Sequence, residues 1–227
     1  MLYHEATGSL LLNHPDPLAV REVIPRSMLV KGHGFNIAVK QTPETVRVLR
    51  NMGVQAPAPI QTQYKWPGKY SPFNHQRVMA DFLTMNRRAF NLSEMGVGKT
   101  ASALWAADWL MAKGYVKKAL IITPLSTMDR VWNADIFDVL MHRVASVVHG
   151  SRTQRRDKLA IDADFYILNH DGVTIGPVAE AIRRREDIQL VIIDEASKFR
   201  NAGTEKYKAL TKMLRPDMRL WLLTGTP

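Results

Sequence analysis

The chain has 227 residues, 46% of them hydrophobic, which is enough for one good-sized globular domain and a smaller second unit. It contains no cysteine, which excludes disulfides and thiolate metal sites, and its seven histidines show no metal-ligand spacing, so we expect no structural metal. Lys and Arg outnumber Asp and Glu by 31 to 21, and the net charge of +10 fits a polyanionic partner such as nucleic acid as well as it fits a merely soluble basic surface.

Targeting and membrane segments are not evident in the sequence. No apolar window is long enough to cross a bilayer, and residues 1–5 lack the basic and apolar segments of a signal peptide. We therefore expect a soluble, intracellular protein of the cytoplasm with no membrane partner.

The first sixty residues predict a small α+β module. Residues 2–5 and 9–12 flank a turn-forming Ala-Thr-Gly and indicate a hairpin, and residues 35–39 read as a further strand. A helix with a capping hydroxyl and a proline at its first position is expected over residues 42–53. A proline-rich stretch follows, which predicts a semi-rigid linker with a boundary near residue 62.

From residue 63 to 227, short apolar runs alternate with helical stretches. Runs rich in Val, Ile or Leu occur at residues 119–123, 144–148, 165–168, 190–193 and 220–223. Continuous runs of this kind are typical of strands in a parallel sheet that is buried on both faces. We therefore predict an α/β fold for this region, with a mainly parallel central sheet and helices on both faces.

A candidate phosphate-binding loop, SEMGVGKT at residues 93–100, lies between an apolar run and a predicted helix over residues 100–111. Its glycines would let backbone N–H groups approach phosphate oxygens, and the helix would direct its positive dipole end to the same place. Lys99 would reach the terminal phosphates and Thr100 would bind Mg2+. The generic pattern has glycine where this chain has Glu94, so the strand–loop–helix order carries the prediction. The residues expected to bind the nucleotide here are Glu94, Met95, Gly96, Val97, Gly98, Lys99, Thr100 and Ala101.

Two adjacent carboxylates, Asp194 and Glu195, directly follow an apolar strand. Ligands of open α/β sheets bind outside the carboxyl ends of the strands. Asp194 would hold Mg2+ directly or through water, and Glu195 would orient the water that attacks the terminal phosphate. The alternative is that both carboxylates only cap the next helix, but the phosphate loop upstream favours hydrolysis. Lys99, Asp194 and Glu195 are therefore the predicted catalytic residues.

These segments together resemble the superfamily-two helicases and, within them, the Swi/Snf-like DNA translocases. Residues 93–100 look like motif I, DEAS at 194–197 like motif II, and LTGTP at 223–227 like motif III, in the form typical of the Swi/Snf branch. The resemblance covers residues 70–227 and implies a RecA-like lobe that binds ATP and Mg2+. It also implies that Thr224, Gly225 and Thr226 couple the nucleotide to the rest of the motor.

Residues 72–77, PFNHQR, resemble the adenine-reading segment of the same family. Gln76 would pair with adenine, because a primary amide offers both a donor and an acceptor, and Arg77 would stack on the ring face. The alternative is an ordinary surface glutamine on a helix over residues 75–83.

Two strand ends are similar to the DNA-contacting segments of the family. Residues 121–127 look like motif Ia, in which Thr123, Pro124 and Ser126 would contact the DNA backbone without reading sequence. Asn169 and His170 fall where the family has another segment near DNA, with a plain turn as the alternative. Trp132 matches a tryptophan that the family often carries on the next helix, and we expect it in the core.

The resemblance also implies that ATP lies between two RecA-like lobes, of which the second lies outside these 227 residues and supplies an arginine. An arginine finger contributes roughly three to five orders of magnitude in rate in analogous enzymes. We therefore expect this chain to bind ATP and to hydrolyse it slowly or not at all, and the full-length protein to be a DNA-dependent ATPase that translocates on duplex DNA.

Other functions remain open at this point. A strand-separating helicase or a restriction motor subunit would use the same lobe, and a non-catalytic ATP-responsive DNA-binding module would share its binding residues. A small-molecule kinase would leave Gln76 and residues 224–227 unexplained. The N-terminal module, residues 1–62, is similar to the small HARP-type modules that precede some Swi/Snf-like annealing helicases, which suggests DNA binding.

Overall fold

The computed structural model describes residues 1–225 and divides into two compact units, residues 1–65 and 66–227. The division falls a few residues beyond the boundary predicted near residue 62. Among the residues that the structure describes, no helix combines the length and the apolar character needed to cross a membrane.

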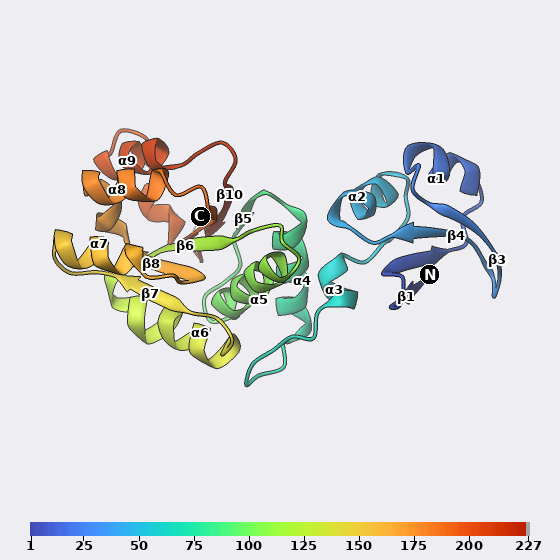
Figure 1. The fold of residues 1–227 in the computed structure, drawn as a ribbon, viewed down its shortest axis with the longest axis horizontal. Helices are drawn as coiled ribbons and strands as arrows, with labels where there is room; N and C mark the ends of the chain where they lie inside the picture. Colours follow the sequence, from blue (N-terminus) through green and yellow to red (C-terminus); the bar gives the residue numbers. More distant parts are fainter. Residues whose placement is uncertain (226–227) are drawn as a thin grey trace. The chain divides into compact units, whose positions relative to one another are not determined.

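The N-terminal unit is built on a four-stranded antiparallel sheet with the order β1–β2–β4–β3 (Figure 1). Its elements are β1 (Leu2–His4), β2 (Ser9–Leu12), α1 (Pro17–Val23), β3 (Met28–Gly32), β4 (Phe35–Lys40), α2 (Pro43–Asn51) and α3 (Pro59–Gln63). The β1–β2 hairpin, the β4 strand and the α2 helix confirm the predicted elements, and Thr42 caps α2 by accepting from the backbone N–H of Thr45. α1 and β3 are additional to the predicted elements.

The linker prediction is wrong at α3, which forms part of the N-terminal unit. The buried amide of Gln41 explains why. It donates to the carbonyl oxygen of Pro57 (3.0 Å) and accepts from the hydroxyl of Thr62 (2.6 Å). Pro59 occupies the first turn of α3, where a helix needs no N–H donor, so the proline-rich stretch folds against β4 instead of spanning open solvent.

The C-terminal unit contains a six-stranded sheet with the order β5–β10–β9–β6–β8–β7. Its strands are β5 (Arg88–Asn91), β6 (Lys118–Thr123), β7 (Ala145–Val148), β8 (Phe165–Asn169), β9 (Ile188–Asp194) and β10 (Arg219–Leu223). Every neighbouring pair is parallel, which confirms the predicted α/β fold. All five residues of β8 are buried, as expected for a strand covered on both faces.

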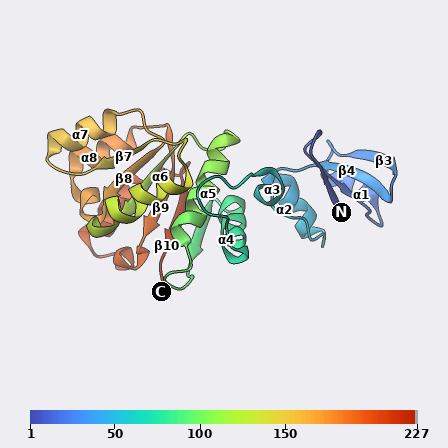
Figure 2. The ribbon, with the colours of Figure 1, turned by 90° about the horizontal axis from the view of Figure 1, so that it is seen from below.

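Helices cover both faces of this sheet (Figures 1 and 2). One face carries α4 (Asn74–Met85), α5 (Lys99–Ala112) and α6 (Ala134–Val139), and the other carries α7 (Arg152–Ala160), α8 (Gly176–Arg183) and α9 (Glu205–Met213). Four short helical turns join the elements: η1 (Leu125–Thr127), η2 (Met128–Asn133), η3 (His170–Thr174) and η4 (Ala196–Phe199). Because all strands run the same way, the segments that follow them meet at one edge of the sheet.

Candidate functional site

The carboxyl ends of β5, β10 and β9 bring the three main motifs together. The phosphate-loop segment follows β5, Thr224 follows β10, and Asp194 ends β9, and these strands are neighbours in the sheet. A cavity of about 460 Å³ opens between them. The predicted residues that line it are Met95, Gly96, Lys99, Asp194, Glu195, Thr224 and Gly225.

The loop itself depends on glycine at two close approaches. Gly98 has a φ of 77°, and a Cβ atom there would collide with the side-chain amide of Gln76. A Cβ atom on Gly225 would lie 2.7 Å from Cγ of Met95. Gly98 therefore combines a left-handed φ with a close approach to the Gln76 side chain, and a side chain at position 225 would have to displace that of Met95.

Lys99 is the first residue of α5, and its ammonium group folds back over the loop. Nζ donates to the carbonyl oxygens of Ser93 (2.9 Å) and Glu94 (2.6 Å). Burial lowers the pKa of Lys99, while the nearby charge of Asp194 acts in the opposite direction. The N-terminus of α5 has no side-chain cap, so its first N–H groups and the Lys99 ammonium form a cationic pole at the cavity.

The carboxylate of Asp194 is held by three donors. Oδ2 accepts from the hydroxyl of Thr123 (3.1 Å) and from the indole N–H of Trp132 (3.0 Å), and Oδ1 accepts from the backbone N–H of Glu195 (3.0 Å). Glu195 is exposed and left-handed, with a φ of 49°. The Glu195 side chain makes no capping bond to η4, which argues against a role as a mere helix cap. A left-handed backbone at a residue other than glycine is strained, and such strain is concentrated at functional sites.

The predicted contact of Gln76 with adenine stays a prediction. Oε1 of Gln76 accepts from the backbone N–H of Phe73 (2.9 Å), and the amide borders the loop at Gly98. The guanidinium of Arg77 lies over the ring of Trp66, 5.3 Å from its centroid, so the expected stacking partner of Arg77 is an indole of this chain and not a base. The prediction for Arg77 is corrected accordingly.

Phe73 and His75 lie beside the loop and are not among the residues that the sequence predicts to bind the nucleotide. Their rings stack with centroids 5.7 Å apart, and the Phe73 side chain is 69% exposed. Nε2 of His75 lies 3.1 Å from the carbonyl oxygen of Val97, which ties the stack to the phosphate loop. An aromatic residue three positions before Gln76 was the available signal. The pair forms an exposed apolar platform beside the amide.

Three of the predicted DNA contacts are directed into the protein instead. Thr123 is fully buried against Asp194, and Asn169, 6% exposed, accepts from Nη1 of Arg155 (3.0 Å). His170 is 7% exposed, and Nε2 lies 2.8 Å from the backbone oxygen of Asp194. Burial lowers the pKa of His170, which favours its neutral form. The prediction that these side chains touch a DNA backbone is wrong for this structure.

The remaining predicted residues differ in accessibility. Ser126 is exposed in η1 and Pro124 is half-buried beside it, so both stay available to a ligand. Val97, Thr100 and Ala101 are half-buried, the last two in the first turn of α5. Thr226 lies outside the described residues, as does Pro227.

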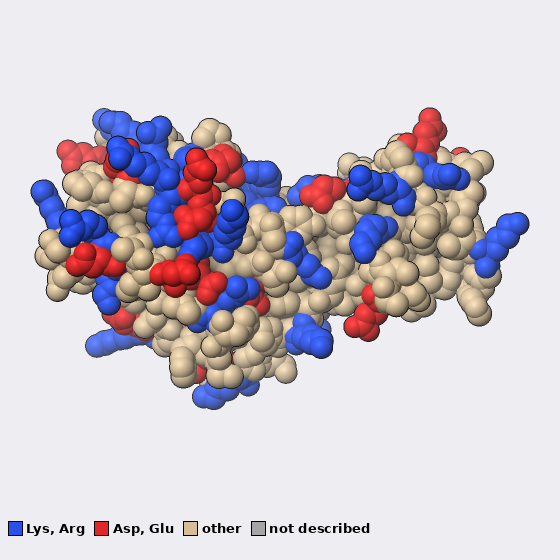
Figure 3. Space-filling model, viewed as in Figure 1, with Lys and Arg blue, Asp and Glu red and all other residues tan. Residues whose placement is uncertain are grey.

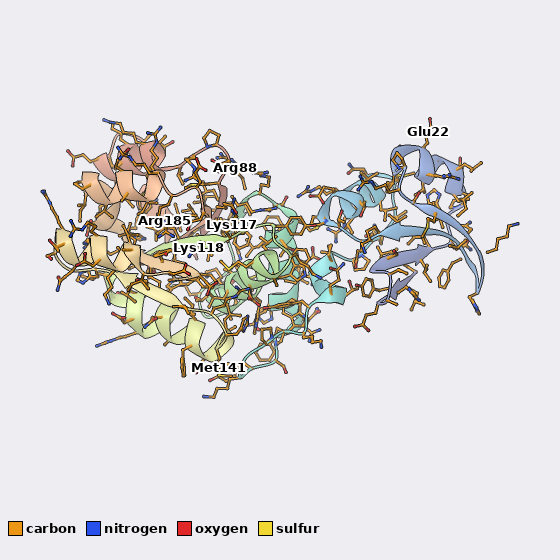
Figure 4. All side chains as sticks on the ribbon, viewed as in Figure 1. Glu22, Arg88, Lys117, Lys118, Met141 and Arg185 are labelled. Atoms are coloured by element: carbon orange, nitrogen blue, oxygen red, sulfur yellow. The ribbon has the colours of Figure 1, made fainter. Side chains whose placement is uncertain are left out.

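Several basic residues of the C-terminal unit lie away from this cavity. Lys118 begins β6, and Arg185 precedes β9, so both belong to the amino-terminal edge of the sheet (Figure 4). Lys118 pairs with Asp162, and Arg185 pairs with Asp187 at 2.5 Å. Lys and Arg are interspersed with Asp and Glu on the drawn face of this unit (Figure 3). The net charge of +10 therefore does not form one uniform basic patch there.

One family model and several known proteins are similar to this chain. A family model described as the SNF2-related domain matches residues 77–227. A SWI/SNF-related matrix-associated actin-dependent regulator of chromatin subfamily A containing DEAD/H box 1 homolog from Drosophila melanogaster is 31% identical over 166 residues, 68% of this chain and 19% of that protein. The uncharacterized ATP-dependent helicase YqhH of Bacillus subtilis is 27% identical over 160 residues, 70% of this chain and 27% of that protein.

Solved structures with the same fold include the Sulfolobus solfataricus SWI2/SNF2 ATPase core in complex with dsDNA. It matches with a TM-score of 0.60 and 20% identity over 71% of this chain and 33% of that chain. A second structure, the Sulfolobus solfataricus SWI2/SNF2 ATPase core domain, matches with a TM-score of 0.57 and 19% identity over 72% of this chain and 34% of that chain. At these identities the likeness shows the fold alone. The chain spans only between 19% and 34% of the length of these relatives.

Proposed function

This chain belongs to the SNF2-related domain family, and from that premise we propose that residues 66–227 are the ATP-binding lobe of a DNA-dependent ATPase that translocates on or remodels DNA. One observation carries the proposal: the ends of β5, β9 and β10 place a loop lysine, two carboxylates and an uncapped helix N-terminus around one cavity. These are the parts that phosphoryl transfer from a nucleotide to water requires.

The residues around the cavity fit a magnesium-bound triphosphate. Oxygen ligands are those that Mg2+ prefers, and the Asp194 carboxylate supplies them at the cavity. The Thr100 hydroxyl, in the first turn of α5, would add another. When bound, Mg2+ neutralises charge on the phosphates and polarises the terminal one. Gly98, whose φ of 77° favours glycine, would present backbone without a Cβ atom to the phosphates.

The chain's own residues then have distinct tasks. Lys99 exchanges the carbonyl oxygens of Ser93 and Glu94 for phosphate oxygens, because a charge-assisted bond to an anion is stronger than one to a neutral carbonyl. Glu195 orients the attacking water and accepts its proton. Gln76 reads the base, with Phe73 and His75 beside it as an aromatic platform.

Turnover and movement need more than these residues. We propose that a second RecA-like lobe in the full-length protein completes the site and that closure of the two lobes drives translocation on duplex DNA. Ser126 and Pro124 provide sequence-independent contacts to the DNA backbone. The description of the Sulfolobus core as a complex with dsDNA supports a duplex substrate.

The names of several relatives, such as the ATP-dependent helicase fft3 of Schizosaccharomyces pombe, favour a strand-separating activity as the second candidate. Displacement of a triplex-forming strand without duplex unwinding would support translocation, and unwinding would support the helicase. A non-catalytic ATP-responsive module would change its DNA affinity with ATP and release no phosphate, even with the second lobe added in trans.

Phosphate release by the full-length protein, with and without duplex DNA, tests the proposal. We expect DNA to stimulate release, Lys99→Ala to abolish it together with ATP binding, and Glu195→Gln to abolish release while ATP still binds. Lys113→Ala, at the exposed C-terminal end of the same helix, is the matched control and should behave as wild type. Equal release by wild type, Lys99→Ala and Glu195→Gln would contradict the proposal.

The N-terminal unit has a separate proposed role. We infer that it is a DNA-binding module, from its similarity to HARP-type modules. Deletion of residues 1–65 is then expected to lower DNA affinity and to leave Mg-ATP binding unchanged. Unchanged DNA affinity after the deletion would refute this role.

A further inference from the structure

The Asp194 carboxylate is more tightly constrained than a metal ligand at the end of a strand needs to be. A carboxylate offers about four acceptor positions, two on each oxygen. On Asp194, three of them are filled: two on Oδ2, by Thr123 and Trp132, and one on Oδ1, by the backbone N–H of Glu195. One position on Oδ1 is left for a metal ion or a metal-bound water.

The two donors to Oδ2 come from the same stretch of chain. Thr123 ends β6, and Trp132 lies in η2, a π-helix that continues directly from η1. Both side chains are fully buried. π-helical turns are rare and are concentrated at functional sites, because the wider turn redirects one side chain. Here η2 buries Met128 and Trp132, and the indole of Trp132 reaches Asp194.

A second hydroxyl extends this network toward the surface. Oγ1 of Thr127 lies 2.7 Å from Oγ1 of Thr123 and 3.0 Å from the carbonyl oxygen of Pro124. A hydroxyl has a single proton, so when Thr123 donates to Asp194, Thr127 must donate to Thr123 and give up its bond to Pro124. Thr127 is the neighbour of the exposed Ser126. The network therefore runs from an accessible turn to the carboxylate.

We propose that Thr123 and Trp132 are positioning residues that hold Asp194 with a single open position for magnesium and so couple metal binding to the turn at residues 124–127. The proposal rests on the function proposed above. It assigns to these side chains a role in metal geometry, distinct from the DNA contact that the sequence predicts for Thr123.

Purely structural hydrogen bonds would stabilise the fold without affecting the metal. The distinguishing quantity is the magnesium dependence of nucleotide binding: the ratio of the dissociation constants of a fluorescent ATP analogue in EDTA and in Mg2+. A structural role leaves this ratio unchanged in any variant that folds. A positioning role changes it through the affinity in Mg2+ alone.

The experiment uses the 227-residue chain and three variants. Thr123→Val removes the hydroxyl at constant shape, Thr123→Ser keeps it, and Trp132→Phe removes the indole N–H. We expect the ratio to fall about tenfold in Thr123→Val and Trp132→Phe, as for the loss of one bond to a charged group, and to return toward wild type in Thr123→Ser. Affinity in EDTA should stay the same.

Matched controls separate this effect from general damage. Thr84→Val removes another buried hydroxyl, which donates to the Asp81 carbonyl, and Trp221→Phe removes another buried indole N–H, which donates to the Asn86 carbonyl. Both should keep the wild-type ratio. If Trp132→Phe does not fold, Thr127→Val tests the same network from its accessible end, with an expected fall of about threefold.

Two outcomes count against the account in different ways. A wild-type ratio in folded Thr123→Val and Thr127→Val would overturn the positioning role and leave the ATPase proposal standing. A wild-type chain that binds no ATP, or binds it equally well in EDTA and Mg2+, would overturn the proposed function itself.

Discussion

Two groups of strand ends lie along the same edge of the parallel sheet and use their polar residues in opposite directions. After β5 and at the end of β9, Lys99, Asp194 and Glu195 border the cavity. At β6 and β8, Thr123 and Asn169 turn into the protein. A polar residue at the end of a strand therefore identifies a ligand site only when the neighbouring elements leave it exposed.

At β8, the buried guanidinium of Arg155 explains why the side chain of Asn169 points into the protein. The guanidinium of Arg155, on α7, is buried and donates to the carbonyl oxygens of Val148 and Gly150 as well as to Asn169. Burial lowers the pKa of Arg155, so each of these acceptors offsets part of the cost of a buried charge. Asn169 is thereby committed to the interior.

Lys99→Ala gives the largest expected effect and tests whether the residues that border the cavity bind the nucleotide. Loss of the ammonium removes charge-assisted bonds to the phosphates, each worth about 1.5–3 kcal/mol, so we expect Mg-ATP affinity of this chain to fall at least about 100-fold. Titration calorimetry measures it, and DNA affinity should not change. An affinity in Lys99→Ala within a few-fold of wild type would break the assignment of the cavity.

Asn169→Ala tests whether the polar residues at the ends of β6 and β8 stabilise the fold and do not contact DNA. It leaves the buried Arg155 guanidinium with one acceptor fewer, so we expect the free energy of unfolding to fall by about 1–3 kcal/mol. Urea denaturation measures this change, and fluorescence anisotropy with duplex DNA should show no loss of affinity in the folded variant. Weaker DNA binding at unchanged stability would instead return Asn169 to the surface.

Phe73→Ala tests whether the adenine base stacks on the Phe73 ring. Stacking of a base on an aromatic side chain contributes about 1–3 kcal/mol, so we expect ATP to bind about tenfold more weakly. Inorganic triphosphate, which has no base, should bind wild type and variant alike. If both ligands weaken equally, the platform supports the loop and does not contact the base.

The smallest expected effect is that of Ser126→Ala. One hydroxyl bond to a phosphate is worth about 0.5–1.5 kcal/mol, so duplex DNA affinity should fall about threefold at a fixed salt concentration. Ser71→Ala, at another exposed serine, is the control. A threefold loss in both variants, or in neither, would remove Ser126 from the proposed DNA contacts.

Much of the fold and the phosphate end of the site can be predicted from the sequence because their signals are local. Most strands of the parallel sheet contain a short apolar run, with β5 as the exception, and the loop at residues 93–100 is a contiguous motif. β3 is mostly exposed and α1 buries only Val20, so neither carries a strong hydrophobic pattern.

The direction of strand-end side chains depends on residues far away in sequence. Asn169 is turned inward by Arg155, and Thr123 by Asp194. Trp132 is in the core as expected. Its hydrogen bond to Asp194 depends on the π-helical turn, which no local sequence pattern predicts. The partner of Arg77, Trp66, likewise lies in the stretch that looked like a linker.

The cavity at β5, β9 and β10 is the proposed nucleotide site, and a crystal structure of this chain with Mg2+ and a non-hydrolysable ATP analogue would locate the nucleotide. We expect the phosphates on the loop at residues 93–100, with Nζ of Lys99 moved from the carbonyl oxygens of Ser93 and Glu94 onto a phosphate oxygen. A nucleotide in the neighbouring cavity of about 490 Å³ lined by Phe90, Phe199 and Leu222, with Lys99 still bound to its own loop, would refute the assignment.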